Sequence, residues 1–157
     1  SGTDMSYYDE EKKERYIPWV IETSGGVDRT ILFLLLDVYH EEENEKGKRV
    51  FLKLNPRLAP YKAAVFPLVA NKPQLVEKAR EVYKNLKAQH INTAWDDRGN
   101  IGKRYYSQDE IGTPFCITID YQTIEDGTVT VRDRDTAKQI RVLQSELIDY
   151  IKKQLIV

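Results

Sequence analysis

The sequence predicts an α/β domain built on a mixed sheet, preceded by a separate acidic segment. Apolar strand-like runs alternate with amphipathic helical runs between residues 49 and 121, a pattern typical of parallel strands joined by helices. Residues 125–134 read EDGTVTVRDR, a tight turn followed by an alternating strand, which indicates an antiparallel hairpin. The 157 residues are enough to bury one proper hydrophobic core.

The first expected elements are a strand at about residues 17–23 and a helix from residue 27 to about residue 40. The glycines Gly25 and Gly26 form the turn between them. The helix is apolar nearly all round, so it needs cover on every side, and we expect the partner surface to be mostly absent from residues 1–157. Residues 40–48, HEEENEKGK, are charged and contain a glycine, so we expect a linker there and a domain boundary between residues 46 and 47.

The remaining elements follow from periodicity and from their end signals. The run KAAVFPLV suits a strand that is buried on both faces. Pro73 fits the first turn of a helix, and Gly112 fits the end of another. The expected strands span residues 49–54, 62–69, 92–96, 113–121, 128–134 and 138–142, and the expected helices span residues 73–89, 101–110 and 144–155.

Charge is distributed unevenly along the chain. Residues 1–46 carry 5 basic and 12 acidic side chains, whereas residues 47–157 carry 19 basic and 13 acidic ones, a net charge of +6. A basic domain suits a polyanion such as RNA. No apolar run approaches the roughly 18–20 residues of a membrane span, so no membrane partner is expected. The single cysteine, Cys116, excludes an internal disulfide, fits a reducing cytoplasm and is expected to be a small buried side chain.

Two groups of residues are candidates for binding. The segment VIETSGGVDR, residues 20–29, combines a carboxylate, a hydroxyl, two glycines and a guanidinium. Its structural interpretation is that Glu22 and Ser24 cap the following helix and that Arg29 pairs with Asp28 or Asp37. The second group supplies the cations and aromatic rings that bind single-stranded RNA. It consists of Lys103, Arg104, Tyr105 and Tyr106, with Arg57 and Lys62 as further candidates.

The charged runs of the second half of the chain also have interpretations that involve no ligand. The run KRYYSQDE can also form a solvated amphipathic helix without any RNA contact. The alternating charges of VRDRDT, residues 131–136, are expected to pair across a hairpin and not to bind a metal. His40 and His90 are isolated, so no metal site is predicted.

Several long stretches carry a resemblance to a known family. LNPRLAPYKAAVFPLV, DDRGNIGKRY and QDEIGTPFCITIDYQTIEDGTVTVRDRDT are similar to glycyl-tRNA synthetases of the dimeric type. VIETSGGVDR resembles motif 3 of the class II catalytic domain. The resemblance implies that residues 1–46 are the C-terminal remnant of that catalytic domain with a linker. It implies that residues 47–157 are a class IIa anticodon-binding domain, a mixed five-stranded sheet flanked by helices.

The resemblance also implies roles for residues. Glycine contacts are expected from Glu22, Thr23, Ser24, Gly25 and Gly26, ATP contacts from Gly26, Val27, Asp28 and Arg29, and tRNA contacts from Lys103, Arg104, Tyr105, Tyr106, Arg57 and Lys62. One departure is that Tyr106 and Ser107 stand where the family usually has two arginines.

The intact enzyme implied by this resemblance is a cytoplasmic homodimer that attaches glycine to tRNA(Gly) using ATP and Mg²⁺. Residues 1–157 alone are expected to hold no cofactor and to be inactive. Two alternatives stay open: a standalone RNA-binding or scaffolding module with this fold, or the same domain of a prolyl, threonyl or histidyl enzyme.

Overall fold

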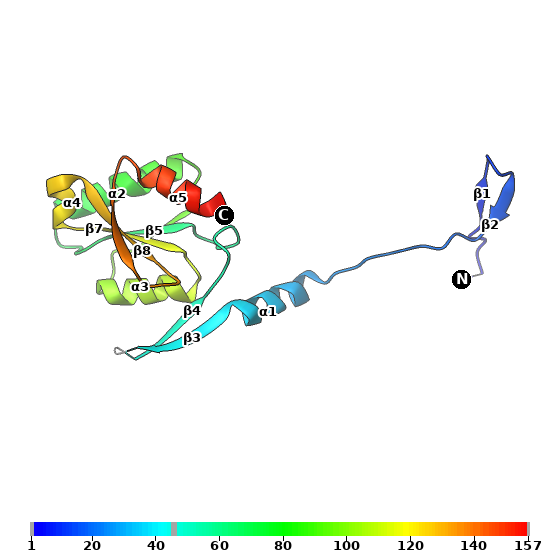
Figure 1. Cartoon of the computed structure of the whole chain (residues 1–157), viewed down its shortest axis with the longest axis horizontal. Coiled ribbons are helices and arrows are strands. Elements are labelled where there is room, and N and C mark those ends of the chain that lie inside the picture. The colour runs from blue at the N-terminus through cyan, green and yellow to red at the C-terminus, as the bar shows by residue number, and fades with distance from the viewer. Residues whose placement is uncertain (1, 45–46, 157) are drawn as a thin grey trace. The chain divides into compact units, whose positions relative to one another are not determined.

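The computed structural model describes residues 2–44 and 47–156, and the chain divides into two compact units, Ser1–Phe33 and Leu34–Val157. Figure 1 gives the element labels. No described helix is long and apolar enough to cross a bilayer. The domain boundary expected between residues 46 and 47 involves Lys46, which lies outside the described residues.

The first unit contains one small hairpin. Strands β1 (Tyr7–Asp9) and β2 (Glu14–Tyr16) are antiparallel, and the Tyr7 and Tyr16 rings meet edge to face at 5.9 Å. Residues 17–26 adopt no regular structure, so the strand expected at residues 17–23 is wrong. A strand persists only where a neighbour takes up its backbone hydrogen bonds, and none of the sheets of the described residues includes this segment.

The helix expected from residue 27 forms as α1 (Val27–Val38), and the division between the two units falls inside it. The expected linker at residues 40–48 is wrong, because an antiparallel hairpin of β3 (Tyr39–Asn44) and β4 (Gly47–Leu52) occupies this stretch. Its charged side chains pair across the strands, as in the contact of 2.6 Å between Lys48 Nζ and Glu41 Oε2. The acidic run followed by basic residues therefore marked a hairpin and not a linker.

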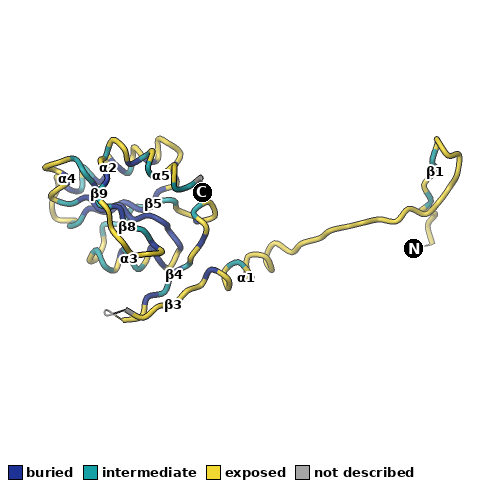
Figure 2. The backbone as a smooth tube through the Cα atoms, in the orientation of Figure 1, coloured by how far each residue is buried: buried dark blue, intermediate teal, exposed yellow. Residues whose placement is uncertain are grey.

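The expected mixed five-stranded sheet is confirmed in the second unit. The strand order is β6-β5-β7-β8-β9, with β5 parallel to β6 and β7, and with β8 antiparallel to β7 and β9. The strands are β5 (Ala63–Pro67), β6 (Thr93–Trp95), β7 (Phe115–Ile119), β8 (Thr128–Asp133) and β9 (Gln139–Leu143). Every residue of the central strands β5 and β7 is buried, as the continuous apolar runs predict (Figure 2).

Helices cover both faces of this sheet. In Figure 1, α2 (Pro73–Ala88) and α5 (Leu147–Ile156) lie above the sheet, and α3 (Ile101–Glu110) lies below it. The larger core joins α2 and α5 to one face through residues such as Val65, Ile117 and Val131. On the other face, α3 packs on a smaller core of Ala64, Phe66 and Cys116. Burial raises the pKa of the Cys116 thiol, as expected for a cysteine that fills the core.

The helices begin and end where local signals predict. Pro73 occupies the first turn of α2, and the Asn100 side chain caps α3 by accepting from the Lys103 N–H at 2.9 Å. Gly112 has a φ of +80°, and a Cβ there would lie 2.7 Å from Leu54 Cδ1. Only glycine permits both this conformation and this approach, so Gly112 lets the loop after α3 pack against the end of β4.

The connection between β7 and β8 differs from the expected tight turn. A short helix, α4 (Tyr121–Asp126), intervenes, and Gly127 ends it in the left-handed conformation at φ +70°. A capping box at Asp120 and Thr123 begins this helix. The glycine of EDG is therefore the cap of a helix and not the centre of a hairpin turn.

Candidate nucleic-acid interface

A strip of polar side chains crosses β8 and β9. It lies on the same face of the sheet on which α3 packs against β5 and β7. The register aligns Arg132 with Cys116 and with Gln139, and Cys116 belongs to the core under α3. Since alternate residues share a face, the same side carries five polar residues, which we call the polar strip. They are Thr128, Thr130, Arg132, Gln139 and Arg141.

A cavity of about 410 Å³ opens between this strip and α3. We call it the α3 cavity, and its lining consists of Arg49, Ile101, Gly102, Tyr105, Tyr106, Arg132, Ala137 and Gln139. Two guanidinium groups, two phenol rings and one amide line it, without a carboxylate. Cavities of about 550, 540 and 500 Å³ are larger, but each has at least one carboxylate in its lining. The cavity of 540 Å³ shares Thr128 and Arg141 with the polar strip and is also lined by Glu146 and Asp149. The composition of the α3 cavity is therefore the one most suited to an electron-rich, planar ligand.

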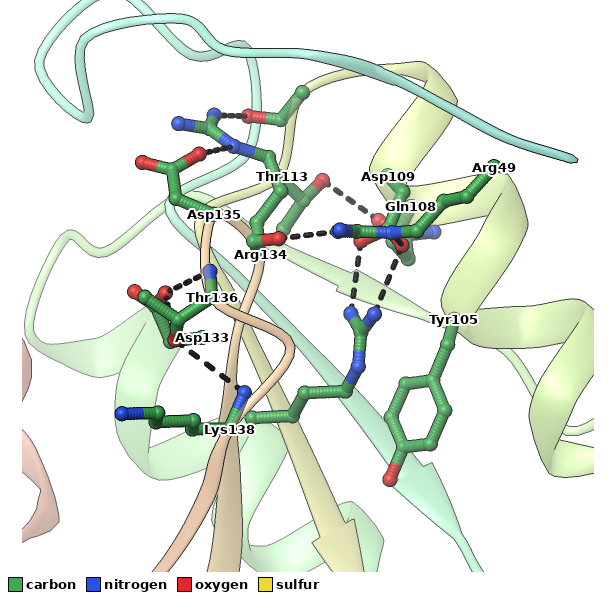
Figure 3. A network of polar contacts seen from close by, with 12 residues as sticks. Arg49, Tyr105, Gln108, Asp109, Thr113, Asp133, Arg134, Asp135, Thr136 and Lys138 are labelled. Atoms are coloured by element: carbon green, nitrogen blue, oxygen red, sulfur yellow. Dashed lines mark hydrogen bonds and ion pairs between the residues drawn. The ribbon is translucent and has the colours of Figure 1, made fainter. Parts of the chain in front are cut away.

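A buried carboxylate holds the two guanidinium groups of this cavity in place. Asp109 is fully buried on α3 and accepts from Arg49 Nε at 2.8 Å (Figure 3). It also accepts from Arg132 through two parallel bonds of 2.8 and 3.0 Å. The Arg49 guanidinium bonds Glu42 at 2.5 Å as well and donates to the backbone carbonyl of Arg134. One carboxylate thus fixes two cations from two different sheets against one helix.

Arg134 serves the fold and not the cavity. Its guanidinium is 2% exposed and donates to the carbonyls of Gly112 and Leu54 at 2.7 and 2.8 Å, and to Asp135 at 2.7 Å. The Asp133 side chain accepts from the backbone and hydroxyl of Thr136 (Figure 3). The charges of VRDRDT do not pair with one another across the hairpin as expected, and Arg132 also lines the α3 cavity. The main partner of Arg132 is Asp109, and Arg134 pairs with its sequence neighbour.

Tyr105 forms part of the cavity wall in a fixed orientation. Its hydroxyl bonds Thr118 at 2.6 Å, and its ring lies edge to face with Phe66 at 5.8 Å. The Arg132 guanidinium lies 4.9 Å from the ring centroid. Burial raises the pKa of Tyr105, so its hydroxyl stays protonated at neutral pH. These contacts hold both Tyr105 and Arg132 rigidly before any ligand arrives.

Arg141 lies beside the cavity on the polar strip and is held by acceptors on several sides. Its Nε donates to the Thr128 hydroxyl at 2.9 Å and its Nη2 to the Thr128 carbonyl at 3.1 Å. Its Nη1 donates to Asp120 at 2.6 Å and to the Thr130 hydroxyl at 2.8 Å. The side chain is nevertheless 29% exposed.

The structure separates the four α3 residues expected to contact RNA. Lys103 is exposed, and Tyr106 is half-buried in the lining of the cavity. Arg104 is instead 2% exposed. Its guanidinium donates to three backbone carbonyls: Pro67 at 2.6 Å, Gly99 at 2.8 Å and Arg98 at 3.1 Å. Arg104 thus ties the loop before α3 to the end of β5, which assigns it a structural role.

The other two expected RNA contacts do not line the cavity. Arg57 is exposed in the loop before β5. The Lys62 ammonium donates to the carbonyls of Arg57 and Ala59 at 2.7 and 2.8 Å. Burial lowers the pKa of Lys62. Its ammonium holds this loop in shape, which makes it a poorer candidate for an RNA contact than Lys103.

The residues expected to contact glycine and ATP all lie in the first unit, and all are exposed. They are Glu22, Thr23, Ser24, Gly25, Gly26, Val27, Asp28 and Arg29. The Gly26 carbonyl accepts from Thr30 at the start of α1, and none of the eight lines any of these cavities. The described residues also contain no cluster of three or more metal-ligating side chains.

Sequence reasoning missed five residues that shape the interface. They are Arg49, Asp109, Arg132, Gln139 and Arg141. The alternation in TVTVRD and QIRVL signals which side chains share a face, so Gln139 and Arg141 could have been found from it. Asp109 lies 60 residues from Arg49 and 23 residues from Arg132 in the sequence, so no local pattern predicts these two contacts.

Comparison with known proteins identifies the fold. The family model described as the anticodon binding domain matches residues 62–154, more than half of the chain. This chain belongs to the anticodon-binding domain family. The matched region includes the whole five-stranded sheet and every residue of the α3 cavity lining except Arg49. The expected anticodon-binding fold is thereby confirmed.

Relatives of this anticodon-binding domain are glycine–tRNA ligases. The ligase of Borreliella afzelii is 53% identical over 153 residues, covering 97% of this chain and 34% of the relative. That of Corynebacterium efficiens is 52% identical over 161 residues, covering 99% of this chain and 34% of the relative. The chain therefore spans about a third of these ligases and corresponds to the anticodon-binding region of glycyl-tRNA synthetase.

A solved structure supports the fold independently. The prolyl-tRNA synthetase of Cryptosporidium parvum aligns with a TM-score of 0.62 and 25% identity, covering 67% of this chain and 22% of that one. The identity to the glycine–tRNA ligases is about twice as high. Between the glycyl and prolyl families, the glycyl family is therefore the one that these comparisons favour.

Proposed function

We propose that this domain binds the anticodon arm of tRNA(Gly) through the α3 cavity and the polar strip. The observation that carries the proposal is the lining of the cavity: two guanidinium groups, two phenol rings and an amide, without a carboxylate. Unpaired RNA bases are held by stacking on aromatic or guanidinium planes and by hydrogen bonds to their edges. Rigid support from Asp109 and Thr118 lowers the entropy lost when such a base is bound.

The charges around the cavity favour RNA over a neutral ligand. Residues 47–157 carry a net charge of +6, and Lys103 is exposed on α3 beside the cavity-lining Gly102. A lysine there can neutralise one phosphate of the anticodon loop as a mobile point charge. In this proposal the cavity holds a base and Lys103 contacts the backbone.

The whole protein is proposed to be a glycine–tRNA ligase that attaches glycine to tRNA(Gly) using ATP and Mg²⁺, as a homodimer. Support comes from the 52–53% identity to such ligases over nearly the whole of this chain. The residues Glu22 to Arg29 would contribute to the glycine and ATP sites together with further parts of the enzyme, because all eight are exposed in this chain. The alternative of a standalone RNA-binding or scaffolding module is less well supported, since it gives no reason for retaining VIETSGGVDR.

The proposal is tested by binding an anticodon stem-loop of tRNA(Gly) at several salt concentrations. Lys103→Ala should weaken binding and reduce the slope of log affinity against log salt by about one. Lys84→Ala is the matched control, because Lys84 is also exposed but lies on α2, on the opposite face of the sheet. If the two changes weaken binding equally, the RNA does not bind at α3.

A further inference from the structure

Arg141 has an environment that is unusual for an RNA-binding arginine. Four hydrogen bonds, to the Thr128 hydroxyl and carbonyl, the Thr130 hydroxyl and Asp120, occupy most of its five N–H donors. The remaining direction lies toward Asp126, whose Oδ1 is 3.8 Å from Nη2. Guanidinium donors lie in the plane of the group, so these partners surround its rim and leave its flat faces without a hydrogen bond.

This arrangement does not suit a phosphate. A phosphate oxygen needs free N–H donors, and those of Arg141 are already committed to protein acceptors. It would also meet the carboxylates of Asp120 and Asp126, which together outnumber the single positive charge of Arg141. The group is therefore electrostatically compensated, although 29% of its side chain remains exposed.

We propose that the exposed face of the Arg141 guanidinium is a stacking platform for one unpaired RNA base, next to the base held in the α3 cavity. The inference rests on the proposed function and extends it to a second base. A guanidinium plane stacks on a base as an aromatic ring does. Because its rim is held by threonines and Asp120, the plane is already oriented when RNA arrives.

The register of β9 places this platform at a useful distance. Arg141 lies two residues from Gln139, which lines the cavity, on the same face of the strand. Two residues along a strand separate the two backbone positions by about 7 Å, and the Arg141 guanidinium extends further along the strip, away from Gln139, to Thr128. A nucleotide strand that inserts one base beside Gln139 can thus lay the neighbouring base over Arg141, across the polar strip.

The test compares Arg141→Lys with the parent chain on two kinds of RNA probe. The probes are the anticodon stem-loop of tRNA(Gly) and versions in which one loop nucleotide at a time is abasic. Lysine keeps the charge but has no flat face, so Arg141→Lys should weaken binding of the intact loop about 5- to 30-fold. The salt slope should not change, and the variant should bind one of the abasic loops as tightly as the parent does.

The matched control is Arg98→Lys, since Arg98 is 93% exposed and has only a loose contact of 3.8 Å with Asp96. It should show no loss that depends on a particular base. If Arg141→Lys weakens all probes equally, or changes the salt slope by about one, then Arg141 contacts phosphate or supports the fold, and the platform is refuted. A parent chain that does not bind the intact loop refutes the proposed function itself, and the platform with it.

A second measurement needs no substitution, in case Arg141→Lys fails to fold. A base stacked over the guanidinium should shift the Arg141 Nε–Hε proton resonance upfield through its ring current when RNA is added to the parent chain. The shift should disappear with the abasic loop that lacks that base. An Nε–Hε resonance that stays in place while the RNA binds would overturn the platform and leave the proposed function intact.

Discussion

At the scale of single residues, the interface depends most on Asp109. Its carboxylate is fully buried and balances two guanidinium groups, which are themselves almost completely buried. Removing one member of such a group leaves uncompensated charge in the interior, which is usually much more costly than losing an exposed ion pair.

We therefore predict that Asp109→Asn destabilises the domain strongly. Arg132 would keep its charge but lose its counter-ion, and Arg49 would keep only its pair with Glu42, at a cost of about 3–5 kcal/mol in the free energy of unfolding. Urea denaturation measures this directly. Asp97→Asn, which breaks only an exposed contact of 3.9 Å with Arg80, is the control and should cost less than about 1 kcal/mol. Similar small losses for both variants would show that the buried network contributes little.

The neighbouring residues Lys103 and Arg104 should respond in opposite ways. Arg104→Ala leaves the carbonyls of Pro67, Gly99 and Arg98 without their charged donor and should lower the free energy of unfolding by at least about 2 kcal/mol. Lys103→Ala should leave stability within about 0.5 kcal/mol and should lower RNA affinity. Melting temperature and stem-loop affinity are measured on both. If the Arg104→Ala protein is as stable as the parent but binds RNA less tightly, then Arg104 contacts RNA and the structural role is wrong.

Stability should fall in acid because of the carboxylates around Arg141. Partial burial favours the neutral form of Asp120, but hydrogen bonds from Arg141 and Thr123 outweigh it, so its pKa is lowered from 3.8. The pKa of Asp126 is lowered to about 2, chiefly by hydrogen bonds from Thr128. Groups with a lowered pKa stabilise the folded state above their ordinary pKa and lose that contribution as pH falls through the folded value. Unfolding free energy should therefore drop between pH about 4 and about 2.

The control for this pH dependence is Asp120→Asn, which removes one of the titrating groups. Its stability should be lower at neutral pH and should decline less steeply below pH about 4. Parallel curves for the parent and the variant would contradict the coupling of Asp120 to Arg141.

At the scale of elements, sequence patterns predicted those whose own residues show a buried apolar run or an amphipathic stripe. The buried runs of β5 and β7 and the apolar stripe of α2 each determine their own structure. The strand expected at residues 17–23 failed because propensity alone cannot replace a paired neighbour. The hairpin β3–β4 was missed because its charges mimic a solvated linker, and its contact with Asp109 spans 60 residues. The positions of interface side chains that depend on such distant contacts therefore cannot be predicted from local sequence patterns.

The hairpin β3–β4 is predicted to depend on Arg49 for its attachment to the five-stranded sheet. Arg49→Met keeps most of the side-chain length but loses the bonds to Asp109 and to the Arg134 carbonyl. Amide hydrogen exchange in β3 and β4 should become faster, whereas exchange in β5 and β7 should change much less, because their core does not include Arg49. Uniform acceleration in all four strands would indicate global destabilisation instead of local release.

At the scale of the whole molecule, fold class and family were predictable because long stretches of the chain are specific to one fold. The five-stranded order and the mixed strand directions agree with that prediction. The placement of the interface was less predictable. The alternating residues of β8 and β9 show which polar side chains share a face, but not whether α3 covers that face. Arg104 and Lys103 illustrate the limit, because adjacent residues of one cationic run took opposite environments.

The central claim is that RNA binds on the α3 side of the sheet. Its most direct test is to titrate the ¹⁵N-labelled chain with the anticodon stem-loop of tRNA(Gly) and follow every assigned backbone and side-chain resonance. Shifts should concentrate at Lys103, Tyr106, Gln139 and Arg141, and residues of α2 and α5 should stay largely unchanged. Shifts that concentrate on α2 and α5, with the α3 cavity undisturbed, would contradict this account of the domain.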